Sequence, residues 1–386
     1  MRIVDVSAFY APLGGGVRTY VEQKLRDGPR RGHEIVIIAP GPDDSTEQRG
    51  EGARIEWVRA PRFPLDRRYR YFDDEAALIA RVERARPDVV EASSPWRSAI
   101  QVGRWASDVP RSLVMHADPL AAFGYRWLGG VASVEAIDRG LEPAWRYLRR
   151  LAAPYDIVIC PSENLAGRLA AQGIANVVAI PLGIEPGVFS PALRDEALRR
   201  RLLARCSLPP EATLLLAIGR HSPEKRWPMV IEAVAAAAYQ RPIGLVLVGD
   251  GRDRAKVLRE VAGNPHIHLA SPVSDRGELA RLMASGDALI HGGDAETFSL
   301  VVAEAVASGL PIIVPDRGGT ADHAASSRGF AYAAGSAADA SRAILDLVDA
   351  APRPGALATP VRTLDDHFAE LFDRYANLAS HAARVA

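Results

Sequence analysis

The sequence of 386 residues lacks several features that mark particular classes of protein. Its two cysteines, Cys160 and Cys206, are too few for a disulfide framework, so we expect buried thiols. No apolar run approaches the roughly 18 residues of a membrane span, and the N-terminus lacks the long apolar stretch of a signal peptide. Lys+Arg and Asp+Glu both number 47, and this balance argues against a nucleic acid as the main partner. A cytoplasmic globular protein is expected.

Lysine is scarce as well. Of the 47 basic residues only three are lysines, Lys24, Lys225 and Lys256, and the others are arginines. An arginine within a motif therefore carries little information in this chain, whereas a lysine within a motif carries more.

The chain does contain a regular alternation of short apolar or β-branched runs with longer helical patterns, in both halves. Strands buried on both faces and followed by crossover helices are typical of a parallel, doubly wound sheet. The sequence therefore predicts an α/β fold with two such sheets. Predicted strands cover 3–6, 34–39, 55–58, 89–92, 112–116, 157–160 and 177–180, then 213–218, 244–248, 266–269, 288–291 and 311–314. Predicted helices cover 17–27, 74–86 and 164–172, then 227–238, 253–262, 278–285 and 300–308.

Two segments rich in proline and glycine interrupt this alternation. One, 181–191, lies between the halves, and the other, 351–360, precedes a final helical pattern. We therefore expect a first domain over 1–183, a second over 184–362 and a terminal helix within 363–386. Ligands of doubly wound sheets bind at the carboxyl ends of the strands, so functional residues should follow strands directly.

Gly14, Gly15 and Gly16 follow the first predicted strand and precede a predicted helix. A glycine-rich turn at a helix N-terminus lets backbone N–H groups approach a phosphate, and the helix dipole assists. The spacing is not G-x-G-x-x-G and no acidic residue ends the second strand, which disfavours a Rossmann-type dehydrogenase. A flexible surface turn explains the glycines equally well.

Arg220 and Lys225 lie in the segment GRHSPEKR, which follows the first strand of the second half. A diphosphate leaving group needs its developing charge neutralised by a divalent metal or by fixed cations. Arginine offers a planar fork of donors and lysine a mobile point charge, so the two can do this without a metal. A solvated basic turn is the alternative interpretation.

The run HGGDAETFSLVVAE is the most informative, because Glu296 and Glu304 lie in an apolar pattern that follows a strand. Carboxylates are seldom buried without partners, and each can accept hydrogen bonds from two vicinal hydroxyl groups. Eight residues of helix span about 12 Å, comparable to the reach from the sugar to the ribose of a nucleotide diphosphate sugar. The N–H groups of Phe298, Ser299 and Leu300 at the helix N-terminus can hold a phosphate. A helix with two exposed glutamates is the alternative.

The run DAETFSLVVAEAVASGLPIIV, followed by GGTAD, closely resembles the E-x7-E signature of retaining glycosyltransferase family 4. The segments GGGVRTY, GRHSPEKRW and LVLVGDG also fall in the family's order and at similar spacing, so the resemblance covers almost the whole chain. It implies the GT-B fold, in which two doubly wound Rossmann-like domains face each other across a cleft. It also implies that the terminal helix crosses back to the first domain.

The resemblance implies roles for individual residues. Glu296 takes the place of the glutamate that contacts the donor sugar, and Glu304 that of the glutamate that binds the ribose hydroxyls. Arg220 and Lys225 correspond to the pair that grips the diphosphate. His116 corresponds to a histidine that approaches the sugar, with a hydrogen-bonded structural histidine as the alternative.

Gly15 and Gly16 correspond to a loop whose backbone contacts the phosphates or the acceptor. Two positions depart from the family pattern. Ser299 stands where the family often has glycine, and Asp322 stands where it usually has glutamate. Neither change removes a group that the chemistry needs.

We therefore expect an enzyme that transfers a hexosyl unit from a nucleotide diphosphate sugar, UDP-hexose or GDP-mannose, with retention of the anomeric configuration. The acceptor is expected to be a hydroxyl group of a glycan, a lipid or a small molecule. No Asp-x-Asp motif ends a strand, so neither a metal nor another cofactor is expected. A nucleotide-sugar epimerase or hydrolase on the same fold, and a non-catalytic partner subunit, are the alternatives.

Three segments bear on the substrates. Backbone groups near 270–273 are expected to read the nucleotide base. The segments 61–72 and 123–150 combine aromatic residues with arginines, as would a peripheral patch that meets a lipid-linked acceptor at the inner face of a membrane. An ordinary surface of an arginine-rich chain has the same composition.

Overall fold

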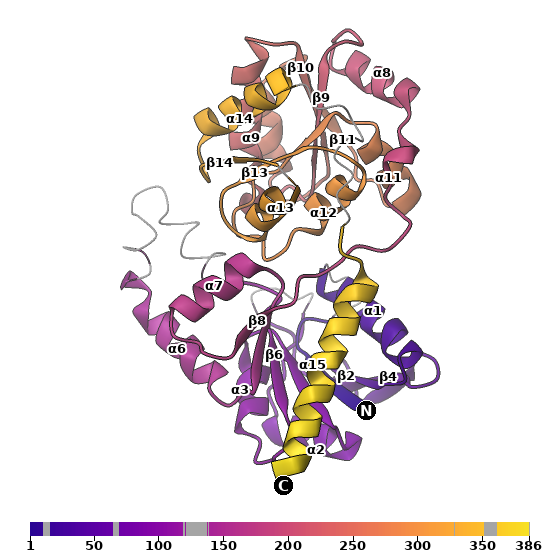
Figure 1. Ribbon diagram of the computed structural model, residues 1–386, viewed down its shortest axis with the longest axis vertical. Helices are drawn as coiled ribbons and strands as arrows, with labels where there is room; N and C mark the ends of the chain where they lie inside the picture. Colours follow the sequence, from indigo (N-terminus) through magenta and orange to yellow (C-terminus); the bar gives the residue numbers. More distant parts are fainter. Residues whose placement is uncertain are drawn as a thin grey trace. The chain divides into compact units, whose positions relative to one another are not determined.

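The computed structural model describes residues 1–10, 16–64, 69–118, 120, 137, 139–327, 329–350 and 361–385. Contacts divide the chain into two units (Figure 1). The first contains Met1–Asp118, Val134–Pro181 and Leu364–Ala386, and the second contains Pro119–Ser133 and Leu182–Thr363. Each unit is a β-sheet covered by helices.

The first unit contains an eight-stranded sheet with the order β3-β4-β2-β1-β5-β6-β7-β8. Neighbouring strands are parallel except for β3 and β4, which form an antiparallel edge. The strands are β1 (Arg2–Ser7), β2 (Glu34–Gly41), β3 (Ser45–Gln48), β4 (Ala53–Arg59), β5 (Val89–Ser93), β6 (Arg111–Val114), β7 (Ile157–Cys160) and β8 (Val177–Ala179).

The described helices of the first unit begin with polar caps where the sequence offers them. The side chains of Asp74 and Ser162 accept backbone N–H groups at the starts of α2 and α7. The terminal helix α15 packs against α1 and β5 within this unit. The helices are α1 (Gly16–Arg30), α2 (Glu75–Ala85), α3 (Arg97–Arg104), α6 (Glu142–Ala152), α7 (Glu163–Ala171) and α15 (Leu364–Val385).

The second unit contains a six-stranded parallel sheet with the order β11-β10-β9-β12-β13-β14. The strands are β9 (Thr213–Ile218), β10 (Ile243–Val248), β11 (Ile267–Ala270), β12 (Ala288–Ile290), β13 (Ile312–Pro315) and β14 (Phe330–Tyr332). The helices are α8 (Glu196–Arg205), α9 (Trp227–Ala238), α10 (Arg254–Val261), α11 (Arg276–Ala284), α12 (Leu300–Ala307), α13 (Gly319–Ser327) and α14 (Ala337–Ala350), with 3-10 turns η2 (Pro191–Leu193) and η3 (Pro223–Lys225).

Strand β9 shows why the second unit folds in layers. Leu214 and Leu216 lie in one apolar cluster with residues of α8, α11 and α12, whereas Leu215 and Ala217 lie in another with residues of α9 and α14. Because strand side chains alternate between faces, an unbroken apolar run buries both faces of the sheet. The predicted doubly wound arrangement is confirmed in this unit.

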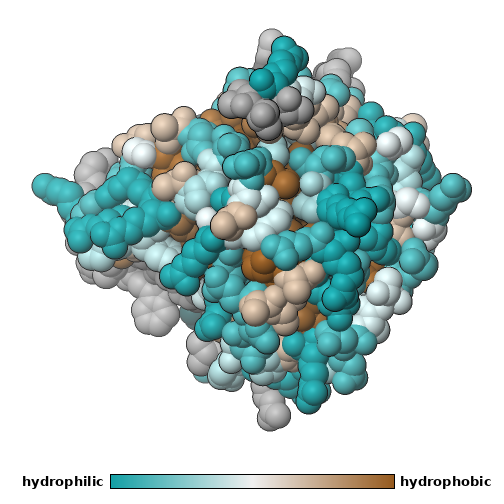
Figure 2. All heavy atoms as spheres, turned by 90° about the horizontal axis from the view of Figure 1, so that it is seen from below, coloured by the Kyte–Doolittle hydropathy of each residue, from teal (hydrophilic) through white to brown (hydrophobic). Residues whose placement is uncertain are grey.

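Apolar side chains on the surface are dispersed. Figure 2 shows one face, on which small apolar areas alternate with hydrophilic side chains. Among the residues that the structure describes, the large exposed apolar ones lie on or beside different elements, namely Trp96, Tyr147, Leu193, Tyr239 and Leu258. Among the helices of the described residues, none has the length and apolar character needed to cross a membrane.

Candidate functional site

The predicted donor residues follow β9 and β12, which are neighbours in the middle of the second sheet. After β9 the chain adds β10 and β11 on one side, and it then returns to β12 and adds β13 on the other. A doubly wound sheet binds ligands at such a switch point, outside the carboxyl ends of the strands. Arg220 and Lys225 follow β9 and Glu296 follows β12, so the fold brings both segments to this point.

The loop after β10 holds the loop after β9 in place. The N–H of His221 donates to the carbonyl oxygen of Asp250 at 2.8 Å, and the N–H of Asp253 donates to that of His221 at 3.0 Å. A Cβ atom on Gly249 would lie 2.0 Å from the carbonyl oxygen of Gly219. Only glycine permits this approach, which explains the VGDG segment.

Lys225 and Glu296 form an ion pair at the switch point, with Nζ and Oε1 2.5 Å apart. Their side chains are 16% and 23% exposed, so a solute can reach both. Burial would raise the pKa of Glu296, but the ammonium group of Lys225 and the nearby His291 hold that pKa well below its usual range. The carboxylate is therefore ionised at neutral pH and accepts hydrogen bonds.

Two contacts beside this pair were not predicted from the sequence. The buried ring of His291 lies with Nε2 3.5 Å from Oε1 of Glu296. Arg226 donates through Nε and Nη2 to the two carboxylate oxygens of Asp294, at 3.1 and 3.0 Å. This fork joins the loop after β9 to the loop after β12 and so fixes the spacing of Lys225 and Glu296.

Helix α12 begins at Leu300, as predicted, so Glu304 lies on the helix and Glu296 on the loop before it. The helix does not extend back to Glu296 because Ser299 has a φ of 70° and a ψ of 82°, in the left-handed region that favours glycine. A glycine would therefore suit this position. Among the described atoms, the buried Oγ of Ser299 has no hydrogen-bond partner.

The segment GGTAD supports the loop before α12. The N–H of Gly319 donates to the carbonyl oxygen of Glu296 at 2.7 Å, and a Cβ atom on Gly319 would lie 2.4 Å from the carbonyl oxygen of Thr297. Nε2 of His323 donates to the carbonyl oxygen of Phe298 at 2.8 Å, and the two rings pack edge to face. Asp322 lies in the first turn of α13, within this support.

Glu304 lies one turn before the end of α12 and is 6% exposed. Arg276, at the start of α11, approaches it with Nη1 2.8 Å from Oε1. Burial raises the pKa of Glu304, and Arg276 opposes that rise. The guanidinium group of Arg276 also lies over the ring of Phe189, 4.8 Å from its centre. The sequence did not indicate Arg276, whose partner is distant along the chain.

The remaining predicted residues are less enclosed or lie in the first unit. Arg220 is exposed, and its carbonyl oxygen accepts a hydrogen bond from the indole N–H of Trp227 at 2.9 Å. Gly16 is the exposed first residue of α1, and Gly15 lies outside the described residues. His116 follows β6 by two residues, and its Nε2 lies 3.3 Å from the Oγ of Ser93.

Aromatic side chains gather at the switch point of the first sheet, where β1 and β5 are neighbours. Phe9 follows β1 and Trp96 follows β5, and their ring centres lie 5.8 Å apart. Tyr69 lies 5.8 Å from Phe9, and Phe63 lies 6.4 Å from Trp96. Phe63 and Tyr69 of the predicted segment 61–72 thus lie at this switch point. Residues 65–68 of that segment, and 123–136 and 138 of the segment 123–150, lie outside the described residues.

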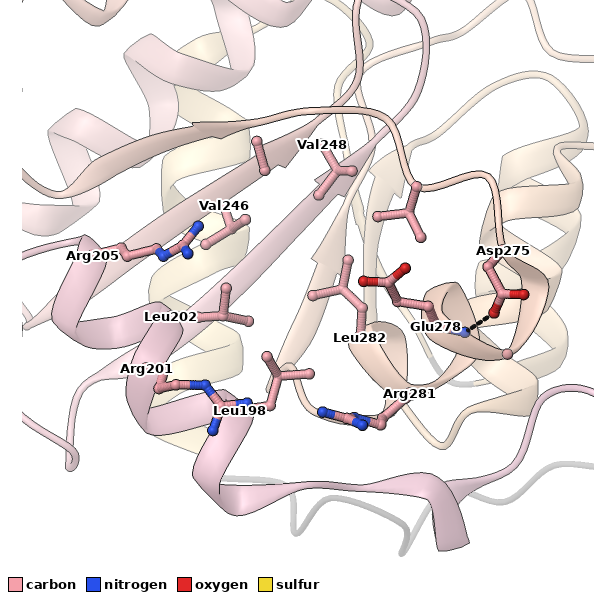
Figure 3. A pocket seen from close by; sticks show the side chains of 13 residues that line it. Leu198, Arg201, Leu202, Arg205, Val246, Val248, Asp275, Glu278, Arg281 and Leu282 are labelled. Carbon is pink, nitrogen blue, oxygen red and sulfur yellow. Dashed lines mark hydrogen bonds between the residues drawn. The ribbon is translucent and has the colours of Figure 1, made fainter.

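A cavity of about 600 Å³ lies between α8, β10, β11 and α11 in the second unit. Figure 3 shows arginines of α8 on one side, with Glu278 and Arg281 of α11 on the other. Ala270 and Val273, from the segment predicted to read the base, line it. The carboxylate of Glu278 points into the cavity, whereas Asp275 accepts the N–H of Glu278 at the start of α11 (Figure 3).

Within the described ranges, no group of three or more histidine, cysteine, aspartate and glutamate side chains could hold a metal ion. The nearest cationic groups to the Glu296 and Glu304 carboxylates are lysine and arginine side chains. Lysine and arginine side chains therefore supply the positive charge at this site.

Comparisons with known proteins agree with this geometry. A family model described as Glycosyltransferase Family 4 matches residues 14–188, and one described as Glycosyl transferases group 1 matches residues 212–350. A GDP-mannose-dependent alpha-mannosyltransferase of Mycobacterium tuberculosis is 31% identical over 83% of this chain and 81% of its own length. A GDP-mannose-dependent alpha-(1-6)-phosphatidylinositol dimannoside mannosyltransferase of that species is 31% identical over 81% and 79%.

Solved structures establish the fold. Sucrose-phosphate synthase from Thermosynechococcus elongatus matches with a TM-score of 0.68 and 18% identity, covering 100% of this chain and 98% of that one. At this identity the match concerns the arrangement of the chain alone. It confirms that the two sheets with their helices are those of the predicted GT-B fold.

Proposed function

Since the chain belongs to glycosyltransferase family 4 and has the GT-B fold, we propose that it transfers mannose from GDP-mannose to a hydroxyl group of a lipid-linked acceptor. Retention of the anomeric configuration and independence of metal ions are parts of this proposal. The observation that carries it is the Lys225–Glu296 pair, which presents an accessible cation and an accessible carboxylate at the switch point of the second sheet.

The donor contacts follow from the charges at the site. Lys225 and the exposed Arg220 supply the positive charge that a leaving diphosphate needs, and the N-terminus of α12 adds backbone N–H groups. Glu296, which is ionised, accepts hydrogen bonds from hydroxyl groups of the transferred sugar. Glu304 accepts hydrogen bonds from the ribose hydroxyls, and Arg276 partly balances its charge.

In the proposed reaction the acceptor hydroxyl attacks C1 of the sugar from the face that the leaving phosphate occupies. The bond from C1 to the phosphate oxygen breaks, the new C1–O bond forms on the same face, and the acceptor proton passes to the departing phosphate oxygen. Arg220 and Lys225 stabilise the charge on that oxygen, which is the task of a divalent cation in metal-dependent transferases. No carboxylate nucleophile is required.

The cavity beside α11 is the proposed site of the base. Guanine carries adjacent N1–H and N2–H donors, and a single carboxylate can accept both, whereas uracil and adenine offer no such pair of neighbouring donors. Glu278 directs its carboxylate into a cavity that leucine and valine side chains line together with arginines, which suits a flat base with this edge (Figure 3). The names of the two mannosyltransferases described above, both GDP-mannose-dependent, support the same base.

The first unit is proposed to bind the acceptor. The ring of Trp96 is 44% exposed at the switch point of the first sheet, and aromatic faces pack well against sugar rings. His116 is proposed to contact the transferred sugar, and the backbone of Gly15 and Gly16 to contact the phosphates. A sugar-bearing lipid would fit this arrangement, and the name of the phosphatidylinositol dimannoside mannosyltransferase contains such a lipid. A lipid acceptor would bring the enzyme to a membrane surface, which we propose to be the inner one.

The proposal is tested by incubating the protein with GDP-mannose and vesicles that contain phosphatidylinositol dimannoside, with and without EDTA. We expect transfer that EDTA does not abolish and a product with the α configuration of the donor, identified by NMR. Lys225→Met should lower kcat/KM by roughly 10²- to 10³-fold. The matched control is Lys256→Met, which makes the same replacement at an exposed residue of α10 and should leave kcat/KM unchanged.

Other results would overturn parts of the proposal. A product of inverted configuration, or loss of all transfer with EDTA, would contradict the mechanism. Release of free mannose without an acceptor would indicate a hydrolase. Thermal stabilisation is the test of the base, since a ligand at about 100 times its Kd adds roughly 2.7 kcal/mol. Stabilisation by UDP and not by GDP would exclude guanine, while Glu278→Gln should weaken stabilisation by GDP selectively.

A further inference from the structure

One buried histidine beside the proposed donor residues has no part in the mechanism described above. His291 directly follows β12, and its side chain is 1% exposed. Among the described atoms, neither ring nitrogen of His291 has a hydrogen-bond partner. Buried polar groups nearly always have partners, because a group without one loses its hydration and gains nothing in return. A histidine in this state, next to Glu296, calls for an explanation.

The second sheet fixes the position of this histidine. The N–H of His291 donates to the carbonyl oxygen of Ile313 on β13 at 2.9 Å, and its own carbonyl oxygen accepts the hydroxyl of Tyr332 at 2.6 Å. The ring packs edge to face against that of Trp227, with their centres 6.3 Å apart. Gly293 leaves room for the ring, because a Cβ atom there would lie 3.0 Å from Nε2. Both the backbone and the ring are therefore held in one place.

Two groups approach the same oxygen of Glu296. Nζ of Lys225 lies 2.5 Å from Oε1, and Nε2 of His291 lies 3.5 Å from it. The first distance is that of a charge-assisted hydrogen bond, whereas the second is just too long for a hydrogen bond of good geometry. Both groups thus approach Oε1, which leaves Oε2 for a hydroxyl group of a sugar.

The protonation states determine which nitrogen of His291 can donate. Burial and the ammonium group of Lys225 lower the pKa of His291, so the ring is neutral at pH 7. The ionised carboxylate of Glu296 can only accept, so Nε2 must carry the hydrogen to bond with Oε1. A hydrogen on Nδ1 would be buried without a partner among the described atoms, and the lone pair of Nε2 would then face the carboxylate. The expected tautomer therefore has its hydrogen on Nε2.

We propose that His291 is a positioning residue that holds Oε1 of Glu296 when the diphosphate of the donor draws Lys225 away. This exchange rests on the proposed function, in which Lys225 binds the diphosphate. Lysine is a mobile point charge, so its ammonium group can leave the carboxylate for a phosphate. Oε1 then moves to Nε2 of His291, and the contact of 3.5 Å becomes a hydrogen bond while Oε2 stays directed toward the sugar. The tautomer of His291 is a property of the second unit alone.

The contact is measured by NMR at pH 8 on protein labelled with ¹⁵N in its histidines, with the His291 ring assigned through its own backbone amide. We expect the Nε2–H tautomer in the unmodified protein. In Lys225→Met, without any ligand, the signal of the hydrogen on Nε2 should shift downfield, because the competing cation is gone. The matched control, Lys256→Met, should leave this signal unchanged. A hydrogen on Nδ1 in the unmodified protein, or an unchanged signal in Lys225→Met, would overturn the positioning role.

GDP tests the exchange in the unmodified protein. At a concentration that raises the thermal stability, GDP should shift the Nε2–H signal of His291 in the same direction as Lys225→Met does. Stabilisation by GDP without this shift would overturn the exchange and leave the proposed donor standing. Absence of any stabilisation by GDP would overturn the proposed donor and the exchange with it, whereas the result for Lys225→Met would still decide whether His291 contacts Glu296.

Kinetics test the positioning role in a third way. His291→Leu has no donor and should lower kcat by about tenfold, as expected for the loss of one hydrogen bond, while the KM for GDP-mannose changes little. His291→Gln can place its amide nitrogen near the position of Nε2 and should recover most of the rate. Full kcat in a His291→Leu protein that is folded by circular dichroism, or equal losses in the two variants, would overturn the positioning role. The NMR experiments use neither variant, so they decide the question even if both fold poorly.

Discussion

Two of the three lysines in this chain bind carboxylates, but in opposite surroundings. Lys24 is fully buried with Asp5 and Glu91 on regular elements of the first sheet. Lys225 is 16% exposed and pairs with Glu296 on loops at the end of the second sheet. A sealed cluster can only position its neighbours, whereas an accessible pair can exchange a protein partner for a phosphate or a sugar hydroxyl. The same pair of residue types is thus sealed in the core of one unit, and in the other it is the pair that we propose to bind the donor.

The largest expected difference between the two pairs appears when the ammonium group of each lysine is removed. Lys24→Met leaves two buried carboxylates without a counter-charge and should lower the free energy of unfolding by about 3–5 kcal/mol. Lys225→Met leaves a carboxylate that water can reach, so its cost should be about 1 kcal/mol or less. Urea unfolding of both variants, followed by circular dichroism, measures the difference.

A compensated variant keeps this test informative if Lys24→Met folds poorly. Adding Asp5→Asn and Glu91→Gln removes the uncompensated charges, and we expect the triple variant to recover much of the lost stability. Equal losses from Lys24→Met and Lys225→Met would mean that burial does not separate the two clusters.

A lower pH should affect the second unit through His323, which holds the loop before α12. Burial lowers the pKa of His323 from 6.5 to about 4. The unfolded chain therefore binds a proton below pH 6.5 that the folded chain refuses until about pH 4, so stability falls as the pH falls through this window. At pH 5 the loss should be about 2 kcal/mol from this residue.

His323→Gln is the variant that isolates this effect. Its amide can still donate to the carbonyl oxygen of Phe298, the partner of Nε2 in the structure, but it does not titrate. The fall in unfolding free energy between pH 7 and pH 5 should be smaller in this variant by about that 2 kcal/mol. An identical pH dependence in both proteins would show that His323 is protonated as readily in the fold as outside it.

The sequence predicted elements well where a local pattern determines them. The predicted strand 213–218 is β9, because an apolar run between breakers suits a strand buried on both faces. Strand β3 (Ser45–Gln48) was missed, since all of its side chains are exposed and polar at a sheet edge. Side-chain partners were missed for a different reason. The tertiary fold pairs Arg276 with Glu304, and it pairs Lys24 with Asp5 and Glu91. No local spacing in the sequence encodes these pairs.

Ser299 provides the smallest test of the comparison, because this residue near the accessible pair has a left-handed backbone, whereas the buried Asp5, Lys24 and Glu91 do not. Its φ of 70° is unfavourable for a residue with a Cβ atom, and its buried Oγ lacks a partner among the described atoms. Ser299→Gly should raise the free energy of unfolding by about 0.5–1 kcal/mol. Ser299→Ala is the matched control, since it also removes the hydroxyl but keeps the Cβ atom, and it should be about 1 kcal/mol less stable than Ser299→Gly. Equal stability of the two variants would locate the cost in the hydroxyl. A more stable Ser299→Gly would show that the backbone before α12 is held in a strained conformation by the loops around Glu296.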